Sequence, residues 1–138
     1  MAFFVVRHLV RRHRFLRQLR QPRLGPEDLK RLLDDGAAIA VIDLRTPLDL
    51  MADPVRIPGA LLISPDELDA RELPREAAIV LYCTEPHEAT SVSAAGELAA
   101  AGSLTRVHVL AGGLEGWRRL GYPVEPVAAP AGEMSSKP

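Results

Sequence analysis

Cysteine is almost absent from this chain, since Cys83 is the only one among its 138 residues. A single cysteine cannot form an internal disulfide, so packing must hold the fold together, as is usual in a reducing compartment. No metal-ligand spacing is visible either, which argues against a structural zinc site. The histidines are four and scattered: His8, His13, His87 and His108.

Long apolar runs are also missing. The first ten residues, MAFFVVRHLV, hold an apolar stretch far shorter than the ~20 residues of a membrane-spanning helix. They also lack the order of a secretory signal, in which charge precedes an apolar core and a cleavage site. With 47% hydrophobic and 25% charged residues, the composition is that of a soluble globular protein, and the length fits one domain.

Acidic residues are absent from residues 1–23, which carry seven arginines, whereas the rest has ten basic and eighteen acidic residues, a difference of −8. We therefore expect a basic arm (1–23) joined to an acidic domain. The arm's apolar residues could form one stripe of a helix. That helix could pack on its own domain, form a homodimer with a second copy, or contact a membrane surface. Nucleic-acid binding is not expected, because no aromatic or lysine-rich interleaving supports it.

Apolar runs and helix signals alternate along the domain, which we place at residues 24–126. Helices are predicted at 26–36, 64–70, 88–101 and 113–121, and the second begins with Ser64 as N-cap and Glu67 completing a capping box. Strand-forming apolar runs occupy 38–45, 60–63, 77–83 and 106–110.

This alternation predicts an α/β fold with a central parallel sheet covered by helices on both faces. The tail, residues 127–138, is rich in Ala, Pro, Gly and Ser and is expected to be disordered. We expect Trp117 in the core, because it has helical spacing from Leu114 and Leu120.

Several polar or flexible positions fall at predicted strand ends. In α/β folds ligand sites lie at the carboxyl ends of parallel strands, so the loops after Asp43, Cys83 and Ala111 should meet at one edge. Gly112 and Gly113 should form a tight turn that lets the backbone approach the Cys83 loop. Asp43 and Arg45 read as a structural ion pair that holds loops in place.

Cys83 lies where a predicted strand gives way to a helix N-terminus, whose partial positive charge and N–H groups favour a thiolate. The alternative is a buried cysteine that acts as a small hydrophobic residue. Glu85 and Glu88 oppose thiolate formation, although acids in a first helical turn also stabilise the helix. His87 reads as an exposed loop residue, with proton donation as the alternative.

Four motifs, in order, resemble the single-domain rhodanese family. They are VIDLRTPLDL (41–50), IPGALLIS (57–64), IVLYCTEPHEATSVSAA (79–95) and VHVLAGGLEGWRRLGYPVE (107–125). The resemblance implies that Cys83 is a catalytic cysteine that accepts a sulfane sulfur as a persulfide and passes it to an acceptor thiol or cyanide. We expect no cofactor and no metal. By the same resemblance, the backbone amides of an active-site loop bind the persulfide. The loop consists of Thr84, Glu85, Pro86, His87 and Glu88.

The loop has the family's length, which argues against the phosphate chemistry of related phosphatases with a loop one residue longer. Two positions depart from the family's pattern, since Glu88 stands where many active members have arginine and Pro86 replaces a glycine. Thiosulfate, a dianion, should therefore be a poor donor. A neutral persulfide or polysulfide, or a protein persulfide, becomes the expected donor.

The loop sequence has the form C-x-x-P-x-E-A. It resembles the loop of a subgroup in which the rhodanese domain follows a DedA-type membrane protein. This resemblance implies a cytoplasmic location, either at the inner face of the membrane or, for a free-standing relative, away from it. Two functions stay open: a sulfurtransferase that works through Cys83, and a catalytically inactive module that regulates, tethers or senses redox state. The acidic loop residues favour the second.

Overall fold

The structure is a computed structural model that describes residues 23–84, 88–102 and 106–128. The basic arm, apart from Arg23, lies outside the described residues, as do Glu85, Pro86 and His87. The helices are α2 (Pro26–Asp34), α3 (Pro47–Ala52), α4 (Glu88–Ala100) and α5 (Gly113–Arg119), with 3₁₀ turns at Pro65–Glu67 and Ala70–Glu72. The strands are β1 (Arg23–Leu24), β2 (Ile39–Asp43), β3 (Val55–Arg56), β4 (Leu61–Leu62), β5 (Ala78–Tyr82), β6 (Val107–Leu110) and β7 (Glu125–Pro126).

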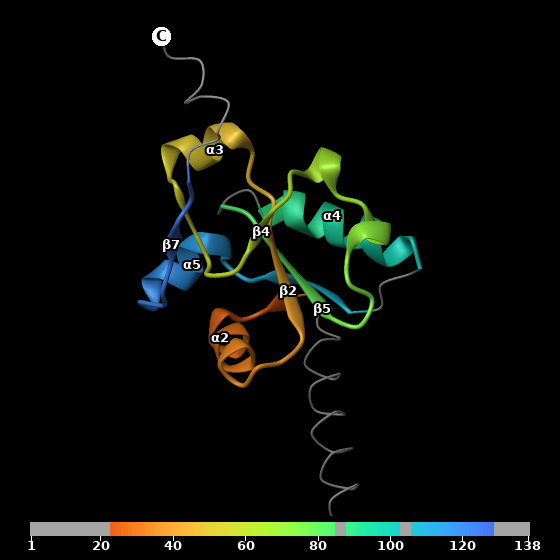
Figure 1. Ribbon diagram of the computed structural model, residues 1–138, viewed down its shortest axis with the longest axis horizontal. Helices are drawn as coiled ribbons and strands as arrows, with labels where there is room; N and C mark the ends of the chain where they lie inside the picture. The colour runs from red at the N-terminus through yellow and green to blue at the C-terminus, as the bar shows by residue number, and fades with distance from the viewer. Residues whose placement is uncertain (1–22, 85–87, 103–105, 129–138) are drawn as a thin grey trace, which may run out of the picture.

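Five strands form one parallel sheet in the order β1-β6-β5-β2-β4. Helices α2 and α5 lie on one side of this sheet and α4 on the other (Figure 1). The predicted α/β fold is therefore confirmed. A second, two-stranded antiparallel sheet pairs β3 with β7 and joins the end of the domain to the segment after α3.

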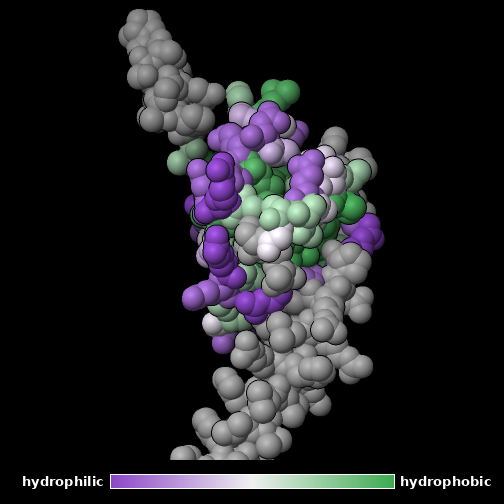
Figure 2. Space-filling view, turned by 90° about the vertical axis from the view of Figure 1, so that its right-hand side faces the viewer, coloured by the Kyte–Doolittle hydropathy of each residue, from purple (hydrophilic) through white to green (hydrophobic). Residues whose placement is uncertain are grey.

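Side chains that alternate along the strands build a core on each face of the sheet. On the face of α2 and α5 the core includes Leu29, Val80, Tyr82 and Trp117, so the predicted core position of the tryptophan is confirmed. The opposite core includes Ile79, Leu81, Ala94 and Leu98, which seat α4. The exposed face of α4 carries mostly small residues, and it shows as a pale area between charged clusters in Figure 2.

Two predictions need correction, and one helix was not predicted. Residues 60–63 were expected to form a buried strand, but β4 is a two-residue strand whose leucines are exposed, since it is the last strand of the sheet among the described residues. Ser64 and Glu67 do not form a capping box; the Ser64 hydroxyl donates to the Glu67 carboxylate instead. The capping box belongs to Thr46 at the start of α3, a helix that the sequence patterns did not predict.

The C-terminal boundary also moves. Val127, which the sequence assigns to a disordered tail, donates its backbone N–H to the Pro54 carbonyl at 2.8 Å. The domain therefore extends through at least this residue. Residues 129–138 lie outside the described residues.

His108 is a buried polar residue on β6, the strand between β1 and β5 in the sheet. Only 2% of it is exposed, and neither ring nitrogen has a hydrogen-bond partner within the described ranges. Burial penalises the charged imidazolium and lowers the pKa of His108 to about 4. The imidazole is therefore neutral in the folded protein at neutral pH.

The depressed pKa of His108 predicts an acid-side loss of stability. The unfolded chain binds this proton near pH 6.5, whereas the folded chain binds it near pH 4, so the free energy of unfolding falls as the pH drops between these values. The loss amounts to at most roughly 3 kcal/mol. We expect His108→Leu to lose less stability over this interval than the wild type, as measured by urea unfolding at several pH values. Equal losses in both proteins would contradict the prediction.

Candidate active site

The loops predicted to meet at one edge do so. Asp43 pairs with Tyr82 at the carboxyl ends of β2 and β5, and Cys83 follows directly. The turn after β6 joins them, since the Leu114 N–H donates to the Cys83 carbonyl at 3.1 Å.

Gly112 and Gly113 make the turn that this contact requires. Their φ angles are 74° and 56°, in the left-handed region that favours glycine. A β-carbon at Gly112 would lie 3.3 Å from the Gly116 α-carbon, so a larger residue would also crowd the first turn of α5. The expected close approach of this turn to the Cys83 segment is confirmed.

The Cys83 sulfur is held by the first turns of α4. The Ser91 hydroxyl donates a hydrogen bond to it at 3.0 Å, and the Ser91 backbone N–H donates a second. Ser91 is fully buried and only 4% of Cys83 is exposed. Ser91 is not among the site residues predicted from the sequence, although a serine in the first turns of the helix after a strand-end cysteine is the signal that could have identified it.

Opposing effects act on the Cys83 thiol. Burial is the largest and raises its pKa, whereas the two hydrogen bonds from Ser91 lower it because they stabilise the thiolate. The carboxylates of Glu88 and Asp43 raise it further. The net pKa is raised above the ordinary value. The helix N-terminus that we expected to favour the thiolate is therefore outweighed by burial and negative charge.

Two residues of the predicted loop are described. Thr84 is half-buried and directly follows Cys83, and Glu88 is the first residue of α4. Glu88 forms an ion pair with Arg23, which comes from β1 at the far edge of the sheet. The acidic residue at the end of the loop thus has a cationic partner that the loop's own sequence does not reveal.

Asp43 and Arg45 form the predicted ion pair, and both side chains are fully buried. The guanidinium contacts both carboxylate oxygens, at 2.8 to 3.1 Å. Its other N–H groups donate to the carbonyls of Asp53, at 2.9 Å, and Val55. The pair therefore ties the end of β2 to the segment that follows α3.

Tyr82 extends this buried network. Its hydroxyl accepts a hydrogen bond from the Ile57 N–H at 3.1 Å and hydrogen-bonds to the Asp43 carboxylate. Burial and the neighbouring carboxylate raise the pKa of Tyr82 far above its ordinary value, so it stays protonated. Asp43, Arg45 and Tyr82 therefore act as structural supports beneath the Cys83 segment.

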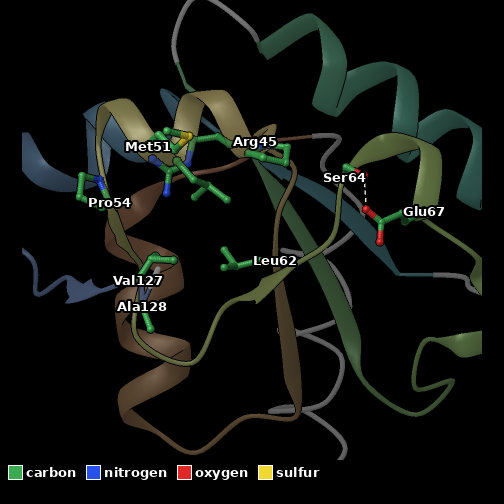
Figure 3. Close-up of a pocket in the computed structure, with 10 residues that line it drawn as sticks. Arg45, Met51, Pro54, Leu62, Ser64, Glu67, Val127 and Ala128 are labelled. Atoms are coloured by element: carbon green, nitrogen blue, oxygen red, sulfur yellow. Dashed lines mark hydrogen bonds between the residues drawn. The ribbon is translucent and has the colours of Figure 1, made fainter. Parts of the chain in front are cut away.

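An apolar cavity of about 560 Å³ lies beside this network, a size that suits a small ligand. In Figure 3, Leu62 faces Val127 and Ala128 across the open space, with Met51 on α3 above it. Arg45 contributes to its wall, but Cys83 does not. The cavity is therefore a neighbour of the cysteine site and not its centre.

The described part of the chain offers no group of three metal-ligating side chains. Among its helices, none has both the length and the apolar character needed to cross a membrane.

The Ser91 hydroxyl should help to set the pKa of Cys83. Ser91→Ala removes one hydrogen bond to the thiolate, so the pKa of Cys83 should rise and its alkylation by iodoacetamide at neutral pH should slow several-fold. The pH profile of the alkylation rate gives both the pKa of Cys83 and the rate at neutral pH. Because the chain has a single cysteine, the signal can be assigned to it without ambiguity. Ser93→Ala, an exposed serine on the same helix, is the control. An unchanged profile for Ser91→Ala would contradict the prediction.

The buried ion pair between Asp43 and Arg45 should contribute far more to the free energy of unfolding than an exposed pair of the same geometry. Arg71 contacts Asp69 with the same spacing and the same side-chain and backbone donors as Arg45 with Asp43, but its side chain is 86% exposed. Arg45→Ala leaves a buried carboxylate unpaired and should cost about 3–5 kcal/mol, as measured by urea unfolding. Arg71→Ala should cause no measurable change. Similar effects of the two substitutions would refute the structural role of the Asp43 pair.

Comparison with curated proteins identifies a relative from Mycobacterium tuberculosis, "Probable adenylyltransferase/sulfurtransferase MoeZ". The two sequences are 37% identical over 103 residues, which cover 70% of this chain and 24% of the relative. The chain thus spans about a quarter of the length of this protein.

Solved structures share the fold. The BH2092 protein from Bacillus halodurans matches with a TM-score of 0.67 at 23% identity, covering 99% of this chain and 100% of that one. Thiosulfate sulfurtransferase from Pseudomonas aeruginosa matches with a TM-score of 0.66 at 24% identity, covering 78% of this chain and 21% of that one.

The family model described as "Rhodanese-like domain" matches residues 25–120, well over half of the chain. The match includes every described residue of the Cys83 site except Arg23. The chain therefore belongs to the rhodanese-like family.

Proposed function

We propose that the protein is a sulfurtransferase in which Cys83 carries a sulfane sulfur as a persulfide. The observation that carries this proposal is the pair of hydrogen bonds that Ser91, in the first turns of α4, donates to the Cys83 sulfur. Such donors stabilise a sulfur anion, which is the reactive form of both a thiol and a persulfide. A buried cysteine with a purely packing role does not need them.

In the proposed reaction the Cys83 thiolate attacks the sulfane sulfur of a donor R–S–SH. A new S–S bond forms at Cys83 while the donor S–S bond breaks, and R–S⁻ leaves with the electron pair. An acceptor thiolate or cyanide then attacks the outer sulfur of the persulfide. The Cys83 S–S bond breaks, and the cysteine returns as a thiol or thiolate, so the cycle needs no external oxidant or reductant.

The relatives support this class of reaction through their names, sulfurtransferase in one and thiosulfate sulfurtransferase in the other. The adenylyltransferase part of the first name is not carried over, because the chain covers only 24% of that protein. We extend the proposal to the active-site loop, residues 84–88, whose backbone N–H groups would bind the persulfide, except at Pro86, which has none.

For the donor we propose a neutral persulfide, a polysulfide or a persulfide on a partner protein. Glu88 at the start of α4 disfavours a dianion such as thiosulfate. Apolar side chains also lie on α3, which follows β2 at the same edge of the sheet: Leu48 is 75% exposed and Met51 62%. An exposed apolar surface of this kind suits a protein partner. A thiol or cyanide is the proposed acceptor.

The second candidate is a module without catalytic activity that regulates, tethers or senses redox state. The observation in its favour is the raised pKa of a Cys83 thiol that is only 4% exposed. The resemblance to rhodanese domains linked to DedA-type proteins adds a proposed setting for either function, the inner face of the membrane with the arm as the contact. A homodimer through the arm is the alternative.

Persulfide formation separates the two candidates. After incubation with a glutathione persulfide donor, the intact protein should gain the mass of one sulfur, and Cys83→Ser should gain none. Cyanide should then remove the added sulfur as thiocyanate. The wild type should also transfer sulfur from this donor faster than from thiosulfate. No adduct on the wild type, with turnover equal to that of Cys83→Ser, would support the inactive module.

A further inference from the structure

Arg23 comes close to the Cys83 site from the far edge of the sheet. It pairs with Val109 of β6, and the next residue, Leu24, accepts the Ala111 N–H at 2.9 Å. The side chain of Leu24 belongs to the core on the α2 and α5 face. Because side chains alternate along a strand, Arg23 points to the opposite face, where α4 begins. There it forms its ion pair with Glu88.

Glu88 is the acid through which Arg23 can affect the thiol. Its side chain is only 18% exposed, so its charge is less screened by water than that of a surface carboxylate. Glu88 raises the pKa of Cys83 and opens the helix whose Ser91 holds the Cys83 sulfur. An arginine bound to this carboxylate offsets the charge and restrains the position of the side chain. Arginine stays charged at every relevant pH, so the offset is permanent.

We propose that Arg23 is a positioning residue of the Cys83 site: by pairing with Glu88, it holds this carboxylate and offsets its negative charge on the Cys83 sulfur. The inference rests on the proposed function, because an anionic sulfur carrier is what needs the offset. The cation at this site therefore comes from β1, outside the active-site loop. Arg23 thereby reduces the negative charge that surrounds a donor or a persulfide at Cys83.

The test is the pH profile of Cys83 alkylation by iodoacetamide in the full-length protein. Arg23→Gln leaves Glu88 without its cation, so the pKa of Cys83 should rise and the rate at neutral pH should fall about three- to tenfold, since one pKa unit changes the thiolate fraction ~tenfold. Glu88→Gln should shift the pKa in the opposite direction. Arg23→Lys keeps the charge and should retain most of the wild-type profile.

The double variant distinguishes an effect through Glu88 from a direct or general one. If Arg23 acts by pairing with Glu88, Arg23→Gln should change the profile little in a Glu88→Gln background, so the two substitutions are not additive. Arg31→Gln is the matched control, because Arg31 also pairs with an acid, Asp28, and its side chain is 60% exposed against 59% for Arg23. It should leave the profile unchanged.

Three results would overturn the inference: a wild-type profile for Arg23→Gln, an equal shift in Arg31→Gln, or full additivity with Glu88→Gln. None of them depends on sulfur transfer, because alkylation needs no sulfur donor. A protein that forms no persulfide but shows the nonadditive shift would refute the proposed function and retain the Arg23–Glu88 coupling. Persulfide formation, together with an alkylation profile that Arg23→Gln leaves unchanged, would support the proposed function and overturn the inference about Arg23.

Discussion

The buried ion pair between Asp43 and Arg45 is the constraint on which the site edge depends. Two charges without access to water are tolerated only when their hydrogen-bonding groups are satisfied. Here the backbone and side chain of Arg45 satisfy the carboxylate, while the Asp53 and Val55 carbonyls accept the guanidinium's remaining donors. Tyr82 completes the network from the neighbouring strand. The end of β2, the segment after α3 and the residue before Cys83 are therefore held together.

The same network also makes the Cys83 thiolate harder to form. The network that fixes the Cys83 segment places the Asp43 charge near the thiol, and the surrounding core excludes water from it, so both effects raise the pKa of Cys83. The donors of Ser91 and the pairing of Glu88 with Arg23 act in the opposite direction. A persulfide, being more acidic than a thiol, would gain from the same donors. Because the net pKa of Cys83 is raised, these donors offset only part of the penalty that burial and negative charge impose on a sulfur anion.

Local sequence patterns predicted what depends on local chemistry. The buried strands around Asp43 and Cys83 came from continuous apolar runs, and the turn at Gly112 came from glycines that tolerate a positive φ. Patterns failed where tertiary position decides. The Leu61–Leu62 run looks like a core strand, but it lies at the sheet edge and is exposed. Ser91 was missed because its role depends on how α4 packs against the end of β5, where its hydroxyl reaches the Cys83 sulfur.

The acidity of the loop shows most clearly why local sequence patterns do not predict the charge around Cys83. Glu88 stands where an arginine is common in the family, and its sequence neighbours offer no cation, so the loop alone indicates a site hostile to anions. Parallel pairing of β1 with β6, however, brings a guanidinium from the start of the domain to this same carboxylate. The charge near a strand-end cysteine is therefore a property of the whole sheet edge. A substitution at the loop position can be offset by a residue that is distant in sequence and adjacent in space.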